Sequence, residues 1–322
     1  MQLINKTISY ILPVFPKAVV GYFAKPYIAG ERLDDAVEIV RELMQEGACA
    51  TLDVLGEEVH HEEQALHAVE LYKQVLQRIY SEKLHSGISV KPTHMGLKID
   101  KEFCYKNIRS LVEMASLYKR FVRIDMEDHT TTQDTIDIYK RLREDFDNVG
   151  TVLQAYLRRT VQDINGLIPL KADLRLCKGI YIEPRSVAWK DGGTVNQNFA
   201  YTLEKLIVNN CYVGIATHDE KLVWEAMRIL DKYQVKKDRY EFQMLLGVDA
   251  DLRRIIINSG HKLRVYVPFG AEWFAYSTRR LKENPAIAGH IMGNLITSIF
   301  KRSEAPKIAE KKEAKAKVDA GS

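Results

Sequence analysis

Short apolar, β-prone runs recur along this chain and alternate with segments whose apolar residues follow a helical period. Eight such runs occupy residues 49–55, 88–93, 121–127, 151–156, 174–179, 211–218, 240–246 and 263–268. Segments such as 221–232 lie between them and carry their apolar residues on one helical face. Strand–helix units of roughly thirty residues, repeated about eight times, are typical of a (β/α)₈ barrel. The sequence therefore predicts an α/β fold of the TIM-barrel type.

Polar side chains tend to stand where these runs end and the next loop begins. In a (β/α)₈ barrel the active site is built at the C-terminal ends of the strands. The candidates at those ends are Lys91, Asp125, Gln154, Arg175, Lys178, His218 and Tyr266. The predicted strands thus give a first map of the site.

The two ends of the chain differ from its middle. We expect residues 1–45 to be a helical segment packed on the barrel, 46–300 to be the barrel, and 301–322 to be a charged disordered tail. The apolar stretch at 3–27 is interrupted by Pro13, Pro16 and Lys17, so it is too short for a spanning helix. Packing on the barrel is favoured there, with contact to a membrane surface or a partner as the alternative.

Composition narrows the function classes. The chain has 322 residues with 47 Lys and Arg against 43 Asp and Glu, and a net charge of +4 is too weak to favour nucleic acid as a partner. The four cysteines lack CxxC spacing, which favours reduced thiols in a cytoplasmic protein over a disulfide or a metal site. No GxGxxG loop is present, so a Rossmann-type nucleotide site is not indicated.

The strongest chemical cluster follows the eighth run, where Gly270 and Pro285 delimit a predicted helix whose N-terminus should face the barrel mouth. Tyr276 precedes Arg279 by three residues and Arg280 by four, so its ring can share a helical face with either guanidinium. Such a pair of arginines can bind a carboxylate through two parallel hydrogen bonds. The alternative is that both arginines form only surface pairs with Glu283, each worth about 0.2–0.5 kcal/mol.

Other strand-end residues leave more than one role open. Lys91 can bind an anion or, if desolvated, act as a Schiff-base nucleophile. Asp125 and Glu127 are two apart and should point to the same side, as a functional or a structural carboxylate pair. Arg175 and Lys178, beside Gly179, can hold a phosphate or an electron-rich ring. His218 is a lone histidine, for which a core or capping role is common.

Taken together, five motifs resemble those of the proline dehydrogenase family, flavin-dependent (β/α)₈ enzymes that oxidise L-proline. In the family's order they are QAY at 154–156, RLCKGIY at 175–181, ATHD at 216–219, EFQMLLG at 241–247 and AYSTRRLKEN at 275–284. The resemblance spans residues 40–300, and the Tyr-x-x-Arg-Arg-x-x-Glu helix is its most specific part. The chain departs from many relatives at Leu246, and its loop at 269–273 differs as well, so the fine shape of the substrate pocket does not follow from the family pattern.

The resemblance implies a role for each matching residue. Asp125 and Arg175 would be the catalytic residues, with Arg175 near the reactive edge of the flavin. The substrate pocket would comprise the clamp Arg279 and Arg280, the supporting Glu283, the third cation Lys91, and the walls Leu245, Tyr266 and Tyr276. The flavin contacts would be Met126, Gln154, Lys178, Gly179, Ile180, Thr217 and His218.

The same resemblance implies the reaction and its partners. FAD would take a hydride from L-proline to give Δ1-pyrroline-5-carboxylate, and a quinone-type acceptor would reoxidise the flavin. The chain looks too short for a fused aldehyde-oxidising enzyme, so the product would pass to a separate pyrroline-5-carboxylate dehydrogenase. We expect a cytoplasmic protein without a metal, with peripheral membrane contact through residues 3–27 as an option.

Two other functions fit the residues alone. A barrel lyase or aldolase would form a Schiff base on Lys91 or Lys178, with Asp125 or Glu127 as the acid or base. A non-catalytic barrel would use the same charged mouth to bind a metabolite. A flavin spectrum that bleaches on addition of L-proline separates both from the dehydrogenase.

Overall fold

The computed structural model describes residues 25–274, 276 and 277, and these contain a closed barrel of eight parallel strands. The strands follow chain order around the barrel as β1(Cys49–Val54), β2(Ser86–Val90), β3(Val122–Ile124), β4(Val149–Gln154), β5(Asp173–Cys177), β6(Tyr212–Ala216), β7(Tyr240–Leu245) and β8(Leu263–Phe269). Strand β8 closes the barrel by pairing with β1, which places Val265 beside Ala50. The predicted TIM-type fold is confirmed.

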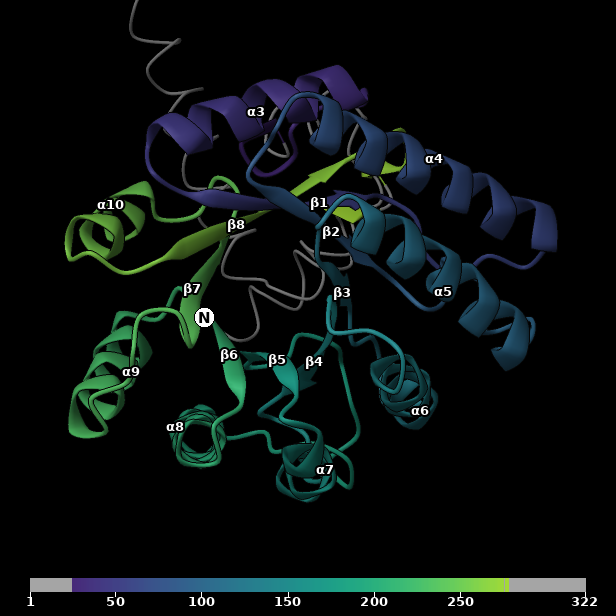
Figure 1. Cartoon of the computed structure of the whole chain (residues 1–322). Coiled ribbons are helices and arrows are strands. Elements are labelled where there is room, and N and C mark those ends of the chain that lie inside the picture. Colours follow the sequence, from purple (N-terminus) through teal and green to yellow (C-terminus); the bar gives the residue numbers. More distant parts are fainter. Residues whose placement is uncertain (1–24, 275, 278–322) are drawn as a thin grey trace, which may run out of the picture. The chain divides into compact units, whose positions relative to one another are not determined.

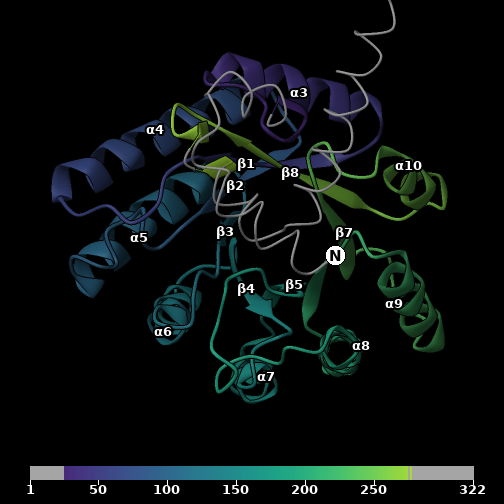
Figure 2. The same ribbon diagram turned by 180° about the vertical axis from the view of Figure 1, so that it is seen from behind.

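Helices surround the strands in chain order (Figure 1), and the view from behind shows the same ring (Figure 2). They are α4(Glu62–Ser81), α5(Lys101–Leu117), α6(Thr132–Arg143), α7(Thr160–Leu167), α8(Gly192–Val208), α9(Glu220–Lys232) and α10(Ala250–Asn258), each following one strand; the short 3-10 turns are η2(Lys25–Tyr27) and η3(Ile168–Leu170). Several begin at an aspartate that accepts a backbone N–H, as Asp100 does from Phe103 at the start of α5.

Helix α3(Leu33–Gln45) precedes the barrel and covers β8 and β1 on the outside. Its buried residues Ala36, Val37, Val40 and Leu43 form one apolar face. The preceding chain is tied to the strand ends, since Ala29 N donates to the Pro268 carbonyl at 2.9 Å. Residues 1–24 and the predicted tail at 301–322 lie outside the described residues.

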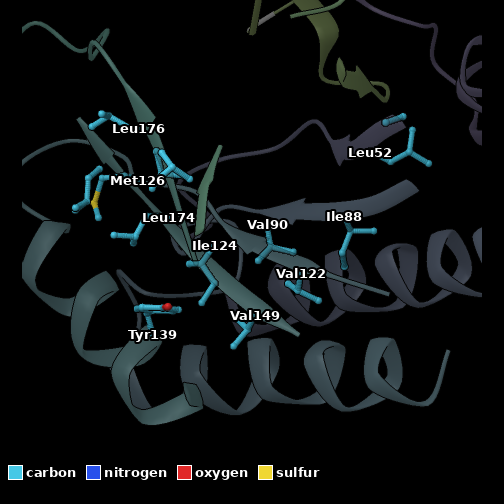
Figure 3. Close-up of a cluster of buried hydrophobic side chains, with 14 of the residues drawn as sticks. Leu52, Ile88, Val90, Val122, Ile124, Met126, Tyr139, Val149, Leu174 and Leu176 are labelled. Carbon is cyan, nitrogen blue, oxygen red and sulfur yellow. The ribbon is translucent and has the colours of Figure 1, made fainter. Parts of the chain in front are cut away.

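The main core lies between the strands and the helices. Figure 3 shows Val122, Ile124 and Val149 on the strands, with Tyr139 of α6 beside them. All four side chains are fully buried. Removing such a side chain from water stabilises the fold by about 1.5–3 kcal/mol each. This layer fixes the strands and thereby the residues that alternate with it and face the barrel interior.

Side-chain hydrogen bonds, several of them between strands that are not neighbours, identify the residues that face the interior. These residues form two polar layers. The lower layer, nearer the N-terminal ends of the strands, consists of Arg123, Asp173, Glu241 and Arg264. The upper layer, nearer the C-terminal ends, consists of Asp53, Ser89, Lys91, Asp125, Arg175, Gln243 and Tyr266.

The structure differs from the sequence prediction at the end of the third run, and it describes the helix after the eighth run only in part. The third run, 121–127, forms a shorter strand than predicted, because the ladder of β3 ends at Ile124 and leaves Asp125 and Glu127 in the following loop. The predicted helix at 271–285 is helical at 273, 274, 276 and 277, and its remainder lies outside the described residues. Among the described helices, none has the length and apolar character needed to cross a membrane.

Candidate active site

Asp125, just past the end of β3, lies at the centre of the upper layer. Its Oδ1 accepts from Ser89 Oγ at 2.6 Å and from Arg175 Nη1 at 2.7 Å, and its Oδ2 accepts from Tyr266 OH at 2.8 Å. Burial alone would raise the pKa of Asp125, but the charges of Arg175 and Lys91, with these hydrogen bonds, lower it overall. Asp125 is therefore a fixed anion at neutral pH.

Arg175 is held on two sides and open on a third. Its Nε donates to Gln243 Oε1 at 2.6 Å, its Nη1 donates to Asp125, and its guanidinium carbon lies 5.2 Å from the centre of the Tyr266 ring. The residue is only 9% exposed. Among the described residues none accepts a hydrogen bond from Nη2, and this atom is not enclosed. An oriented guanidinium edge without a protein partner is suited to a ligand.

Lys91 forms a buried ion pair with Asp53. Its Nζ lies 2.8 and 2.7 Å from the two carboxylate oxygens and 3.5 Å from Tyr266 OH. The two side chains are 4% and 0% exposed. Burial opposes the charge, but Asp53 and Asp125 more than offset it and raise the pKa of Lys91 above its ordinary value. Lys91 is therefore an ammonium group with its donors directed at Asp53 and Tyr266.

Most of the predicted flavin contacts lie at or just after the ends of three neighbouring strands, β4 to β6. Gln154 Nε2 donates to the Glu127 carbonyl at 2.8 Å, and Lys178 Nζ donates to Asp219 Oδ2 at 2.6 Å. Thr217 Oγ1 accepts from the Asp219 N–H at 3.1 Å. These contacts fix each side chain at the end of its strand.

His218 has a defined tautomer. Its Nε2 accepts from the Leu245 N–H at 2.8 Å, and burial lowers the pKa of His218 to about 4. The ring is thus neutral, and its proton resides on Nδ1 because Nε2 is an acceptor. No described residue accepts from Nδ1, so this N–H can donate to a ligand. Leu245, a predicted pocket wall, is placed at the end of β7 by the same contact.

The three remaining predicted flavin contacts differ in their surroundings. Gly179 has a φ of +109°, and a Cβ there would lie 2.1 Å from the Tyr156 ring, so the backbone passes the ring at a distance that a side chain would prevent. Ile180 follows it in the partly exposed loop. Met126 is buried in the main core and lies near Leu174 and Leu176 (Figure 3).

Glu127 does not join Asp125, although strand alternation predicted that the two carboxylates point to the same side. Its oxygens accept from Thr93 N at 2.8 Å and Thr93 Oγ1 at 2.6 Å, in the turn after β2. The difference arises because the strand ends before either residue, so the alternation no longer applies. Burial raises the pKa of Glu127 to about 7.

The predicted carboxylate clamp is described only in part. Tyr276 is buried and packs with Ile28, Leu55 and Trp273. Arg279, Arg280 and Glu283 lie outside the described residues. The structure thus brings together Lys91 and Asp125, which directly follow β2 and β3, with Arg175 of β5 and Tyr266 of β8.

Sequence reasoning missed three members of the upper layer: Asp53, Ser89 and Gln243. Each is a polar residue between two apolar neighbours inside a strand, as Asp53 is between Leu52 and Val54. A buried polar group needs a partner, so a polar residue within an apolar strand was the available signal.

Comparison with known proteins adds an independent finding. A family model described as proline dehydrogenase matches residues 36–292. Proline dehydrogenase 1 of Bacillus subtilis (strain 168) is 34% identical over 273 residues, which cover 85% of this chain and 90% of that protein. Proline dehydrogenase 2 of the same organism is 37% identical over 259 residues, covering 80% and 86%.

A solved structure of proline utilization A (PutA) from Bdellovibrio bacteriovorus, inactivated by N-propargylglycine, superposes with a TM-score of 0.76. The identity is 23%, and the match covers 82% of this chain and 32% of that one. At this identity the likeness speaks for the fold, and it agrees with the closed barrel described above.

Proposed function

Because this chain belongs to the proline dehydrogenase family, we propose that it binds FAD at the barrel mouth and oxidises L-proline to Δ1-pyrroline-5-carboxylate. The coarser assignment, an oxidoreductase acting on CH–NH bonds, follows from the family itself. The observation that best supports the finer one is Arg175, oriented by Asp125 and Gln243 with its Nη2 edge unpaired among the described residues.

The donor set fits a flavin. Arg175 Nη2 and His218 Nδ1 are N–H donors without partners in the described part of the chain; Arg175 lies within β5, and His218 follows the end of β6. The ring system of a flavin carries oxygen and nitrogen acceptors along one edge, to which such N–H groups can donate. When bound, FAD would supply the hydride-accepting chemistry that no amino-acid side chain can provide.

The protein's own residues would orient the substrate and stabilise negative charge on the cofactor. Arg175 would stabilise negative charge at the cofactor edge it faces, and Asp125 would keep the guanidinium in place. Tyr266, whose hydroxyl is fixed by Asp125, would form a wall of the substrate pocket. Lys91 would add positive potential for the substrate carboxylate. Holding the substrate ring in one orientation is a large part of catalysis in such a site.

We further propose that Arg279 and Arg280 grip the substrate carboxylate, with Glu283 holding one of them and Tyr276 beside them. Replacing either arginine by methionine should weaken a proline analogue that carries the carboxylate by about 1.5–3 kcal/mol, the range for hydrogen bonds to charged groups. Pyrrolidine, which lacks the carboxylate, should lose little affinity. Inhibition constants for both ligands measure the difference, and equal losses would exclude the clamp.

The ion pairs of Lys91 and Lys178 disfavour the alternative function, a lyase or aldolase that forms a Schiff base on one of these lysines. A Schiff base needs a neutral amine, whereas Lys91 is protonated and paired with Asp53. Lys178 is paired with Asp219 at 2.6 Å. Borohydride trapping of a carbonyl substrate should therefore fail to modify either lysine.

The cofactor is tested most directly by its spectrum. The purified protein should be yellow, L-proline should bleach the flavin absorbance, and acid or heat should release FAD into the supernatant because we expect non-covalent binding. A protein with no flavin, either bound or released, would rule out the proposal.

The partners form a separate proposal. We expect a quinone-type acceptor to reoxidise the proline-reduced protein faster than oxygen does, and a separate pyrroline-5-carboxylate dehydrogenase to take the product. A cytoplasmic protein with peripheral membrane contact should sediment with lipid vesicles, and deletion of residues 1–24 should abolish that sedimentation. Stopped-flow reoxidation tests the acceptor, and vesicle sedimentation independently tests the membrane contact.

A further inference from the structure

Gln243 of β7 connects the two polar layers of the barrel interior. Its Oε1 accepts from Arg175 Nε at 2.6 Å in the upper layer, and its Nε2 donates to Glu241 Oε1 at 2.7 Å in the lower layer. The residue is 6% exposed. A buried amide bonded at both ends has little rotational freedom.

The orientation of this amide is set by Glu241. The carboxylate accepts from Arg264 Nε at 2.6 Å and lies 2.9 Å from Lys262 Nζ. Burial alone would raise the pKa of Glu241, but the two cations more than offset it and hold that pKa well below its usual range. An ionised carboxylate only accepts hydrogen bonds, so it requires the NH₂ of Gln243 on its side. The amide oxygen must then face Arg175.

Gly214 of β6 leaves the space that the amide occupies. A Cβ at this position would lie 2.4 Å from Gln243 Nε2 and 2.9 Å from Gln243 Cδ. The three nearest atoms all belong to the Gln243 side chain. The φ of Gly214 is outside the left-handed region, so alanine is allowed by the backbone and excluded only by the amide.

We propose that Gln243 is a positioning residue for Arg175, and that Glu241 and Gly214 set the orientation of the Gln243 amide. With Nε bound to Gln243 and Nη1 bound to Asp125, the guanidinium plane is fixed and its Nη2 edge faces the ligand. Without the Nε contact the group can pivot about its remaining bond to Asp125. The identification of that ligand as a flavin rests on the proposed function, whereas the positioning itself rests on the hydrogen bonds.

The first test replaces the amide by an apolar side chain of similar length, Gln243→Met. Titration of the apoprotein with FAD should give a dissociation constant raised about tenfold, the lower end of the effect expected for a hydrogen bond to a charged group. Turnover per bound flavin should fall by a similar factor, with the KM for L-proline changed less than about twofold. Unchanged flavin affinity and turnover would overturn the proposal.

The second variant, Gly214→Ala, retains the polar atoms of Gln243 and Arg175. Gly214→Ala displaces the Gln243 amide by steric contact alone, so it should reproduce the direction of both effects. Combined with Gln243→Met it should add almost nothing to the loss of flavin affinity, because the hydrogen bond from Arg175 through which it acts is already gone. Full additivity of the two variants would contradict the proposal, and this arm remains informative if Gln243→Met folds poorly.

The matched control is Asn107→Leu. Asn107 of α5 is also a buried amide; it donates to the Met95 carbonyl at 3.0 Å and makes no hydrogen bond to a side chain of the upper layer. It should lower the melting temperature and leave the flavin dissociation constant unchanged. Equal loss of flavin affinity in both amide variants would show general destabilisation and overturn the positioning role.

A final measurement separates this proposal from the proposed function. The Nε–H proton of Arg175, assigned by its loss in Arg175→Lys, should exchange slowly with solvent in the wild-type apoprotein and quickly in Gln243→Met. This result does not depend on any cofactor. A wild-type protein that binds no FAD would overturn the proposed function, whereas equal exchange rates in both proteins would overturn the positioning by Gln243.

Discussion

The lower and upper layers of the barrel interior contain similar residues and differ in what those residues still offer. In the lower layer, Arg123 donates to Asp173 at 2.5 Å and to two backbone carbonyls, and Glu241 is shared by Arg264 and Lys262. In the upper layer, Arg175 is paired just as closely yet keeps an unpaired Nη2 edge within the described residues. A buried charge is therefore weak evidence of function, and an oriented donor without a partner is the stronger sign.

The substitution with the largest expected effect removes an ion pair of the lower layer. Asp173→Ala leaves Arg123, which is 4% exposed, without its counterion. The free energy of unfolding should fall by about 3 kcal/mol, the lower end for breaking a buried pair, because the Asp173 side chain is itself 22% exposed. Urea denaturation measures the loss. Turnover per folded molecule should stay near that of the wild type, and a large drop in it would remove the distinction between the layers.

The substitution with the next largest expected effect removes the central arginine of the upper layer. Arg175→Ala should lower turnover per bound flavin about 100-fold, comparable to the loss of one preorganised donor at a developing charge. Affinity for a proline analogue should change much less, since the residue is expected to act on the flavin side. Single-turnover reduction by L-proline, normalised to flavin content, gives the comparison. Equal rates at full flavin occupancy would remove Arg175 from the mechanism.

Glu127 sharpens the comparison through pH, because it is a buried carboxyl at the edge of the upper layer. Its pKa is raised from 4.5 to about 7. Below pH 4.5 the carboxyl is protonated in the folded and the unfolded protein and does not reduce the free energy of unfolding. As the pH rises to 7 the unfolded protein loses this proton first, so the free energy of unfolding falls, and the loss is complete above pH 7. The free energy of unfolding of Glu127→Gln, relative to the wild type, should rise by about 2 kcal/mol from pH 5 to pH 8. Denaturation curves at both pH values test this, and a pH-independent difference would contradict it.

The smallest effect concerns a surface network. Lys101 of α5 pairs with Asp134 and Asp137 of α6 at 2.7 and 2.8 Å, and its side chain is 45% exposed. Lys101→Ala should cost no more than about 0.5 kcal/mol, since solvent screens exposed pairs. The same urea titration applies. A loss as large as that of Asp173→Ala would mean that burial does not separate the interior pairs from those on the surface.

The fold was readable from the sequence because each strand places an apolar face against the helices. Each of the eight predicted runs overlaps one strand, and most boundaries fall within two residues, although the second and third runs end three residues too late. The third run was extended too far because Asp125, Met126 and Glu127 continue its alternation after the hydrogen-bonded ladder has ended. Local pattern gives the side-chain direction along a strand, whereas its end depends on the neighbouring strands.

Part of the site could also be predicted from the strand pattern. Strand-end position identified Lys91, Asp125, Arg175 and Tyr266, which the structure brings together. Their partners were not identified, because Gln243 meets Arg175 across the barrel through a register that no local pattern specifies. Long-range hydrogen bonds need the closed barrel before they can be assigned.

Helix α3 has a consequence for how the chain assembles. Its apolar face packs on β8 and β1, and residue 50 pairs with residue 265, so contacts near the start of the described chain depend on a strand near its end. During synthesis this face and the edge of β1 stay exposed until β8 has emerged, which favours late and cooperative closure. A nascent chain stopped before residue 263 should expose both and depend on chaperones, whereas the seven residues of β8 would allow the ring to close.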